Sequence, residues 1–199
     1  MQVGGNEQSS KAEWRKRLAG QRAAVSVQQR VAEAHALTGA IAGMSLPETV
    51  CGYVPFGTEP GALSLLDALR EAGVRVLLPV VPPTPAALDW AEYTGTSSLA
   101  AGRFRGVLEP AGPRLGPSAI GEAGLVLLPA LAVDHAGVRL GRGAGYYDRS
   151  LGHATPAARL VAVVRDDELV ERLPCEPHDV RMTAALTPGK GLVALPRAT

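Results

Sequence analysis

The feature that most constrains the fold is an alternation of short apolar runs with helix-like segments along the chain. Buried strands are expected at the apolar runs 49–54, 74–80, 124–133, 159–164 and 182–186, with a possible outer strand at 88–93. Helices are expected at about 11–22, 26–43, 62–71 and 147–151. Because strands that alternate with helices tend to pair in parallel, the pattern predicts a largely parallel sheet with helices on both faces.

The first two helices carry clear start signals. Ser10 with Glu13 forms a capping-box pattern, and Ser26 with Gln29 repeats it. Apolar residues at helical spacing in the second helix predict the side that faces the core: Val27, Val31, Ala34, Leu37 and Ile41.

The stretch RLGRGAGYYDR, residues 139–149, has the composition of a phosphate-binding loop. Its glycines allow backbone N–H groups to approach phosphate oxygens, and its three arginines add positive charge. Its carboxylate suits the divalent cation that accompanies a nucleoside triphosphate, and its two tyrosines offer flat faces for a ring. The residues concerned are Arg139, Gly141, Arg142, Gly143, Gly145, Tyr146, Tyr147, Asp148 and Arg149. Ligands of parallel sheets bind beyond the carboxyl ends of strands, where 55–59, Asp134 and 139–148 are all expected.

Other interpretations of this stretch stay open on the residues alone. A tight turn between a strand and a helix would explain the glycines, but not the tyrosine pair or the charges. The dinucleotide-binding fingerprint needs a glycine where Tyr146 stands, although Asp166 or Asp167 could serve as its acidic residue. A mononucleotide P-loop needs a Gly-Lys-Ser/Thr sequence, which does not follow here.

Composition excludes several classes of protein. The net charge of +1 argues against nonspecific nucleic-acid binding, and no apolar run approaches the ~20 residues that span a membrane. The amino terminus lacks a secretion signal, and Cys51 and Cys175 suggest neither a metal site nor a disulfide framework. We therefore expect a soluble, cytoplasmic monomer with a flexible tail at 1–9 and a single domain at 10–199.

Four fragments, in order, carry a resemblance to a known family. They are Lys11 with Arg15, YVPFGTE at 53–59, LLPALAVDHAGVRLGRGAGYYDR at 127–149 and LPCEPHD at 173–179. Together they resemble 5-formyltetrahydrofolate cyclo-ligase, also called methenyltetrahydrofolate synthetase, over nearly the whole chain. The resemblance implies a Rossmann-like, three-layer α/β/α fold with a mostly parallel sheet, like that of sugar-phosphate isomerases and coenzyme A transferases. It also implies ATP- and Mg²⁺-dependent closure of 5-formyltetrahydrofolate, which can carry a polyglutamate tail, to 5,10-methenyltetrahydrofolate.

The resemblance further implies roles for individual residues. Arg142 and Tyr146 would be catalytic, and Asp148 and Asp179 would coordinate Mg²⁺. The folate substrate would contact Val54, Glu59, Arg142 and Tyr146. The ATP-binding residues would be Lys11, Arg15, Arg139, Gly141, Arg142, Gly143, Ala144, Gly145, Tyr146 and Tyr147.

The residues themselves also allow plainer roles. Lys11 and Arg15 lie four positions apart on one helix face, which suits a shared anion but also an ordinary solvated face. Glu59 could equally be a helix-start glutamate, and Asp179 could lie in an ordinary turn. For Asp134, a turn with Gly137 is the favoured role.

Two features depart from the family pattern. Ala144 stands where members often have lysine or glycine, so Arg139 or Arg142 would have to neutralise the phosphates. The segment 82–102 is the least family-like and leaves the shape of the folate pocket open. Two alternative functions therefore stand beside the ligase: a noncatalytic folate- or nucleotide-binding paralogue, and a sugar-phosphate isomerase or transferase on a related fold.

Overall fold

The computed structural model describes residues 9–177 and 179–196 of the chain. The tail expected at 1–9 therefore lies outside the described residues, apart from Ser9, and the division into a tail and one domain stays a prediction. Within the described ranges, every helix is too short or too polar to cross a membrane.

A seven-stranded sheet runs through the described part of the chain in the order β12-β11-β9-β6-β1-β2-β3. The neighbouring pairs from β11 to β2 are parallel, whereas β12 and β3 pair antiparallel at the two edges. This arrangement confirms the expected mostly parallel sheet, with 88–93 supplying an outer strand. The strands are β1 (Thr49–Cys51), β2 (Arg75–Val80), β3 (Asp89–Glu92), β6 (Leu125–Pro129), β9 (Arg159–Val163), β11 (Ala184–Thr187) and β12 (Gly191–Ala194).

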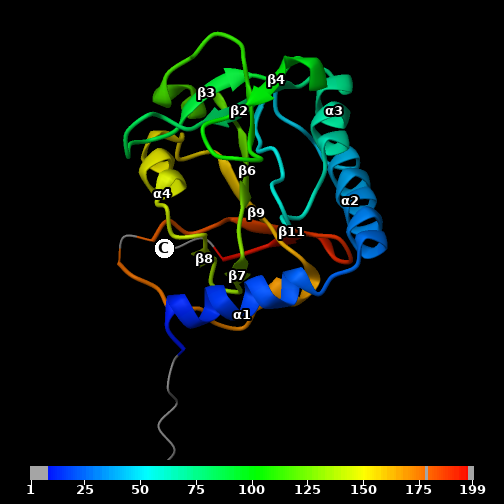
Figure 1. Ribbon diagram of the computed structural model, residues 1–199, viewed down its shortest axis with the longest axis vertical. Helices are drawn as coiled ribbons and strands as arrows, with labels where there is room; N and C mark the ends of the chain where they lie inside the picture. The colour runs from blue at the N-terminus through cyan, green and yellow to red at the C-terminus, as the bar shows by residue number, and fades with distance from the viewer. Residues whose placement is uncertain (1–8, 178, 197–199) are drawn as a thin grey trace, which may run out of the picture.

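Helices cover both faces of this sheet (Figure 1). On one face, α2 (Val27–Ala42) and α3 (Leu63–Glu71) bury Leu37, Ile41 and Leu66 against the strands. On the other face lie α4 (Tyr146–Ser150) and the 3-10 helices η2 (Pro117–Glu122) and η3 (Leu151–His153). The result is the three-layer α/β/α fold that the resemblance implied.

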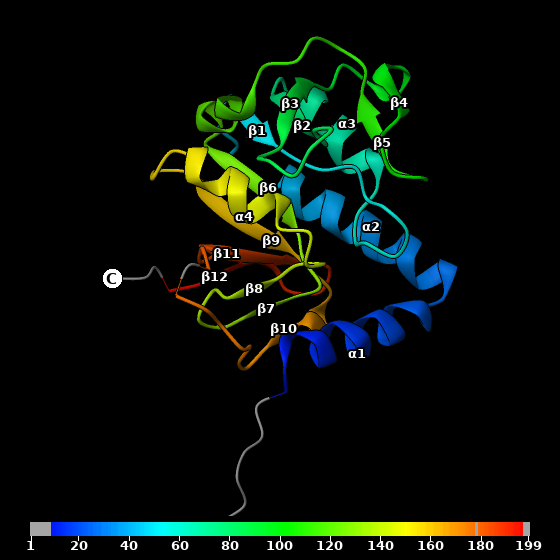
Figure 2. The same cartoon turned by 60° about the vertical axis from the view of Figure 1, so that its left-hand side comes forward.

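Helix α1 (Lys11–Ala23) packs on a second, three-stranded sheet (Figures 1 and 2). This sheet consists of β7 (Ala132–Asp134), β8 (Arg139–Leu140) and β10 (Leu169–Val170). The 3-10 helix η4 (Asp166–Glu168) directly precedes β10. Leu18 of α1 is buried in the cluster that joins the helix to the sheet. The expected capping box is present, because the Ser10 hydroxyl accepts from the Glu13 N–H and the Glu13 carboxylate accepts from the Ser10 N–H. This packing holds α1 beside β8, which leads into the glycine-rich stretch.

The apolar side of α2 is only partly in the core. Ala34, Leu37 and Ile41 are buried as expected, but Val27 and Val31 are 75% and 53% exposed. Figure 2 shows the reason, since the N-terminal end of α2 extends beyond the sheet. The prediction that all five apolar residues face the core is therefore wrong for the first two.

One segment differs from its predicted structure, and another, for which no structure was predicted, forms a hairpin. The apolar run 124–133 is not one strand, because the chain leaves the main sheet after Pro129 and enters the second sheet at Ala132. At this turn the Leu131 N–H donates to the Leu140 carbonyl, which redirects the backbone. The weakly patterned middle of the chain forms a hairpin of β4 (Leu99–Ala101) and β5 (Leu108–Pro110), preceded by η1 (Thr96–Ser98).

Candidate active site

A cavity of about 290 Å³ lies at the carboxyl ends of β1, β2 and β6. This is the position at which parallel α/β sheets bind ligands, and the volume is near the lower end of the range for small-molecule sites. Its lining comes from residues within 53–59, 79–88, 104–109, 129–131 and 139–148, together with Arg22 of α1. Segments far apart in the sequence therefore meet around one site.

The glycine loop, residues 141–145, forms part of this lining between β8 and α4. Gly143 and Gly145 have φ angles of 97° and 71°, which side chains rarely allow. A Cβ atom at Gly145 would lie 2.8 Å from Nη1 of Arg149, and one at Gly141 would lie 2.9 Å from Nη1 of Arg139. Glycine thus permits both the backbone turns and the close packing of guanidinium groups against the loop.

Arg142 and Glu59 face each other across the cavity lining. Nε of Arg142 lies 3.0 Å from Oε1 of Glu59, and the two side chains are 49% and 10% exposed. The second oxygen of Glu59 accepts the Phe56 N–H at 2.9 Å, so both carboxylate oxygens are engaged. The guanidinium also lies 5.6 Å from the Phe56 ring centre. Arg142, a candidate for binding phosphate, and Glu59, a candidate for binding folate, therefore neutralise each other's charge.

Arg139 pairs with Asp148 at the opposite ends of the glycine loop. Nη2 of Arg139 lies 2.7 Å from Oδ1 of Asp148, whose side chain is 51% exposed. The arginine also lies 5.7 Å from the Tyr147 ring centre, and burial, followed by the charge of Glu59, raises the pKa of the Tyr147 phenol well above its usual range. Tyr147 consequently keeps its proton and can donate a hydrogen bond at neutral pH.

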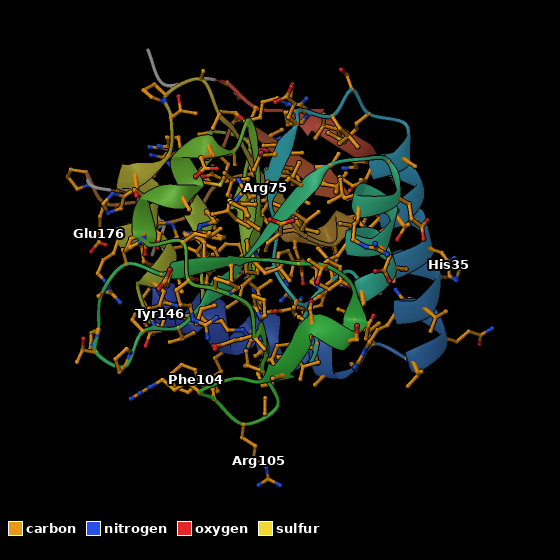
Figure 3. All side chains as sticks on the ribbon, turned by 90° about the horizontal axis from the view of Figure 1, so that it is seen from above. His35, Arg75, Phe104, Arg105, Tyr146 and Glu176 are labelled. Atoms are coloured by element: carbon orange, nitrogen blue, oxygen red, sulfur yellow. The ribbon has the colours of Figure 1, made fainter. Side chains whose placement is uncertain are left out.

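Lys11 and Arg15 contact two different segments rather than one shared anion. Nε of Arg15 donates to the Gly141 carbonyl at 2.9 Å, which ties α1 to the glycine loop. Nζ of Lys11 lies 2.8 Å from Glu176 and 3.0 Å from Oδ2 of Asp179. The side chains of this carboxylate pair come from the segment before β11, and Figure 3 shows Glu176 at the edge of the molecule.

The structure brings most, but not all, of the sequence-predicted site residues to the cavity. Those that line it are Val54, Glu59, Arg139, Gly141, Arg142, Gly143, Ala144, Gly145, Tyr146, Tyr147 and Asp148. Lys11, Arg15 and Asp179 are not part of the lining, although Arg15 contacts the glycine loop.

Two further residues expected near a ligand have other roles. Arg149 donates to the carbonyls of Ala86 and Ala144, so it holds the loop instead of lining the cavity. Asp134 is buried away from the cavity and accepts the N–H groups of Ala136, Val138 and Leu173, which confirms its turn role.

The carboxylates near the cavity offer Mg²⁺ only a partial set of ligands. Among residues 9–177 and 179–196, no three His, Cys, Asp or Glu side chains gather closely enough to hold a metal ion by themselves. Protein sites for Mg²⁺ often supply only one or two carboxylates, while phosphate and water oxygens complete the shell. The half-exposed Asp148 carboxylate at the cavity fits that chemistry, whereas Asp179 is held by Lys11 and the Glu176 N–H.

Sequence reasoning missed several lining residues. Phe104 and Glu109 come from the hairpin region for which no structure was predicted, and Arg22 comes from α1. Phe104 lies 6.5 Å from Tyr146 between ring centres, and Figure 3 shows it beside Tyr146 while Arg105 points outward. For Glu109, the sequence offers one signal of burial, which is that the glutamate stands alone between the apolar residues Leu108 and Pro110.

The parallel sheet and the cavity beyond its strand ends define an α/β protein with a site for a partly anionic ligand. The family model of the 5-formyltetrahydrofolate cyclo-ligase family matches residues 7–188, and the chain belongs to this family of ligases. It is 50% identical over 191 residues to the 5-formyltetrahydrofolate cyclo-ligase of Mycolicibacterium smegmatis, covering 94% of this chain and 97% of that one. The Escherichia coli K12 cyclo-ligase is 33% identical over 147 residues, or 73% and 80% of the two chains.

A solved structure supports the same assignment. The 5,10-methenyltetrahydrofolate synthetase of Aquifex aeolicus superposes with a TM-score of 0.74 at 27% identity, covering 95% of this chain and 94% of that chain. These matches favour the ligase over the sugar-phosphate isomerase or transferase alternative.

Proposed function

We propose that this ligase uses ATP and Mg²⁺ to convert 5-formyltetrahydrofolate, free or polyglutamylated, to 5,10-methenyltetrahydrofolate, ADP and phosphate. One observation carries the proposal. A single cavity combines a glycine loop and two arginines with a largely apolar, aromatic lining. The first part suits a triphosphate, and the second suits the flat rings of a reduced folate. We further propose that the monomer is active.

The nucleotide end of the site is assigned to the glycine loop. Backbone N–H groups of 141–145 would approach phosphate oxygens, while Arg139 and Arg142 would neutralise their charge. Ala144 adds no charge, so this work falls to the two arginines. Arg15 would act through the loop backbone, whose Gly141 carbonyl it holds. Lys11 would reach the nucleotide only by exchanging its contacts with Glu176 and Asp179.

The folate end is assigned to Val54, Glu59 and Tyr146, which line the same cavity. Glu59 would be released for the substrate when Arg142 turns to a phosphate, because the two side chains now neutralise each other. Tyr146 contacts Phe104, and this aromatic pair offers a surface against which a ring can pack.

Asp148 is the residue best placed to hold Mg²⁺ at the cavity, and Asp179 is assigned as a second ligand. Bound Mg²⁺ would neutralise charge on the triphosphate and align its terminal group. Asp148 would exchange its contact with Arg139 for the metal, which frees that guanidinium for phosphate oxygens.

The chemistry follows from the weakness of a formamide as an electrophile. Transfer of the γ-phosphoryl group from ATP to the formyl oxygen would release ADP and create a good leaving group. The N10 lone pair would then attack the formyl carbon, N10 would lose its proton, and the carbon–oxygen bond would break to release phosphate. Arg142 and Tyr146 are assigned to align these groups and to stabilise the developing negative charge.

An absorbance assay tests the proposal directly. Purified protein with 5-formyltetrahydrofolate, ATP and Mg²⁺ should form methenyltetrahydrofolate over many turnovers, visible in the near ultraviolet, and should stop when a chelator removes the metal. Binding of both ligands without turnover would instead identify a noncatalytic paralogue.

A further inference from the structure

Glu109 is a buried acidic residue in the cavity to which the proposed function assigns no role. It lies on β5 opposite Ala100 of β4, is 8% exposed and lines the cavity. Much of the rest of the cavity lining is apolar, including Val81, Leu88 and Val107. Burial of a carboxylate in such surroundings is unfavourable unless hydrogen-bond donors compensate for the lost water.

The protein supplies only part of that compensation. Oε1 of Glu109 accepts the Val81 N–H at 3.2 Å, whereas Oε2 has no hydrogen-bond partner among the residues that the structure describes. Packing fixes the carboxylate in place, because a Cβ atom on Gly102 would lie 2.7 Å from Cδ of Glu109. A positioned acceptor therefore faces a cavity that is large enough for a ligand.

Glu59 does not offer the same opportunity to a ligand, because its oxygens already have partners within the protein. Both of its oxygens accept hydrogen bonds, and Arg142 neutralises its charge. Within the described residues Glu109 forms no ion pair, so its charge and its second oxygen are available to an incoming group. The two glutamates of the cavity thus differ in what they can bind.

We propose that Glu109 recognises the pyrimidine edge of the reduced pterin, an inference that rests on the proposed folate substrate. That edge presents the 2-amino group and the adjacent N3–H, two parallel donors that match the two oxygens of a carboxylate. Oε2 accepts one of them, and Oε1 accepts the other through the lone pair that Val81 leaves unused. Glu109 is then a specificity-determining residue that orients the folate in the cavity.

The test compares binding of 5-formyltetrahydrofolate with binding of its analogue that carries a methyl group in place of the 2-amino group. By calorimetry, the unmutated protein should bind the natural compound about 100-fold more tightly, since the analogue leaves a buried acceptor unpaired. Glu109→Gln keeps the side-chain volume and an oxygen for Val81, but places a donor where an acceptor is needed. Its preference should shrink to about tenfold or less, while ATP affinity stays unchanged.

Glu71→Gln, an exposed substitution on α3, is the matched control and should keep the full preference. A similar preference in Glu109→Gln and the unmutated protein would overturn the assignment. So would equal binding of the two compounds by the unmutated protein, a result that needs no variant to fold. Glu109→Asp has a shorter side chain that draws the carboxylate back, so it should also lose the preference for the natural compound. This variant provides the test if Glu109→Gln is unstable. Binding with the expected preference but without turnover would refute the ligase activity alone and uphold the role of Glu109.

Discussion

At the scale of single residues, three cation–carboxylate pairs join charged groups that are assigned to ligands. Arg142 pairs with Glu59, Arg139 with Asp148, and Lys11 with Asp179. Sequence could identify these residues as candidates, but spacing along the chain gives no indication of which cation lies beside which carboxylate. Each assigned ligand therefore replaces an internal partner of the residue that binds it.

Arg142→Ala should reduce kcat/KM by about 100-fold or more, because it removes a positive group that acts on the developing phosphoryl charge. Stability should change by less than about 1 kcal/mol, since the Arg142 side chain is 49% exposed and such pairs contribute little. Steady-state kinetics and thermal unfolding measure the two effects. Arg70→Ala, an exposed substitution on α3, is the control, and full activity in Arg142→Ala would contradict the assigned role.

Asp148→Asn should raise the Mg²⁺ concentration needed for half-maximal activity by about tenfold or more, because an amide is a weaker ligand than a carboxylate. The amide oxygen can still accept from Arg139, so the loop should keep its structure. Activity measured across a Mg²⁺ titration provides the test. An unchanged metal requirement would remove Asp148 from the proposed metal site.

At the scale of helices and strands, a buried ion pair connects α1 to η4. Arg22 donates twice to Glu168, at 2.6 and 2.7 Å, and once to the Ala130 carbonyl at 2.6 Å. Glu168 also accepts the Arg165 N–H, and both members of the pair are almost inaccessible to water. This network joins the first helix to the turn after β6, and both Arg22 and Ala130 line the cavity.

Glu168→Gln should lower the free energy of unfolding by about 3 kcal/mol, because it leaves the Arg22 charge buried without a counter-charge. Urea unfolding measures the loss. The exposed pair of Arg75 and Glu92 offers a matched control, since Glu92→Gln should cost less than about 1 kcal/mol. If Glu168→Gln and Glu92→Gln lowered the free energy of unfolding equally, burial of the Arg22–Glu168 pair would not add to its contribution to stability.

The sequence predicted the main strands and helices well where apolar periodicity and end signals agree, as in α1 and β2. It failed at 124–133, because a continuous apolar run does not reveal that the backbone changes sheets after Pro129. It also missed the hairpin of β4 and β5, whose three-residue strands have little periodicity. That hairpin carries Glu109, so the least predictable element contributes the unassigned acidic residue of the cavity.

At the scale of the whole molecule, burial of a thiol and of several phenols should make stability sensitive to alkali. Burial raises the pKa of the Cys51 thiol and of the Tyr53 and Tyr147 phenols, whose ordinary values are 9.0 for Cys and 10.0 for Tyr. Above those values the unfolded chain loses protons that the folded protein keeps, so the free energy of unfolding falls as pH rises. The stabilising contribution is complete below about pH 9.

Urea unfolding between pH 7 and pH 11 should therefore show a plateau followed by a decline that begins near pH 9. Cys51→Ala removes the group with the lowest ordinary pKa and should move the start of the decline toward pH 10. A decline at the same pH in both proteins would mean that Cys51 does not contribute.

The contact between Arg15 and the Gly141 carbonyl joins residues 126 positions apart. The residues on which Leu18 of α1 packs include Ala132 and Leu140, which a ribosome adds to the chain long after this helix. Leu18 therefore lacks these packing partners in the nascent chain until that later segment has been synthesised. The contact of α1 with the glycine loop is accordingly a late event in synthesis, because both of its partners must first be made.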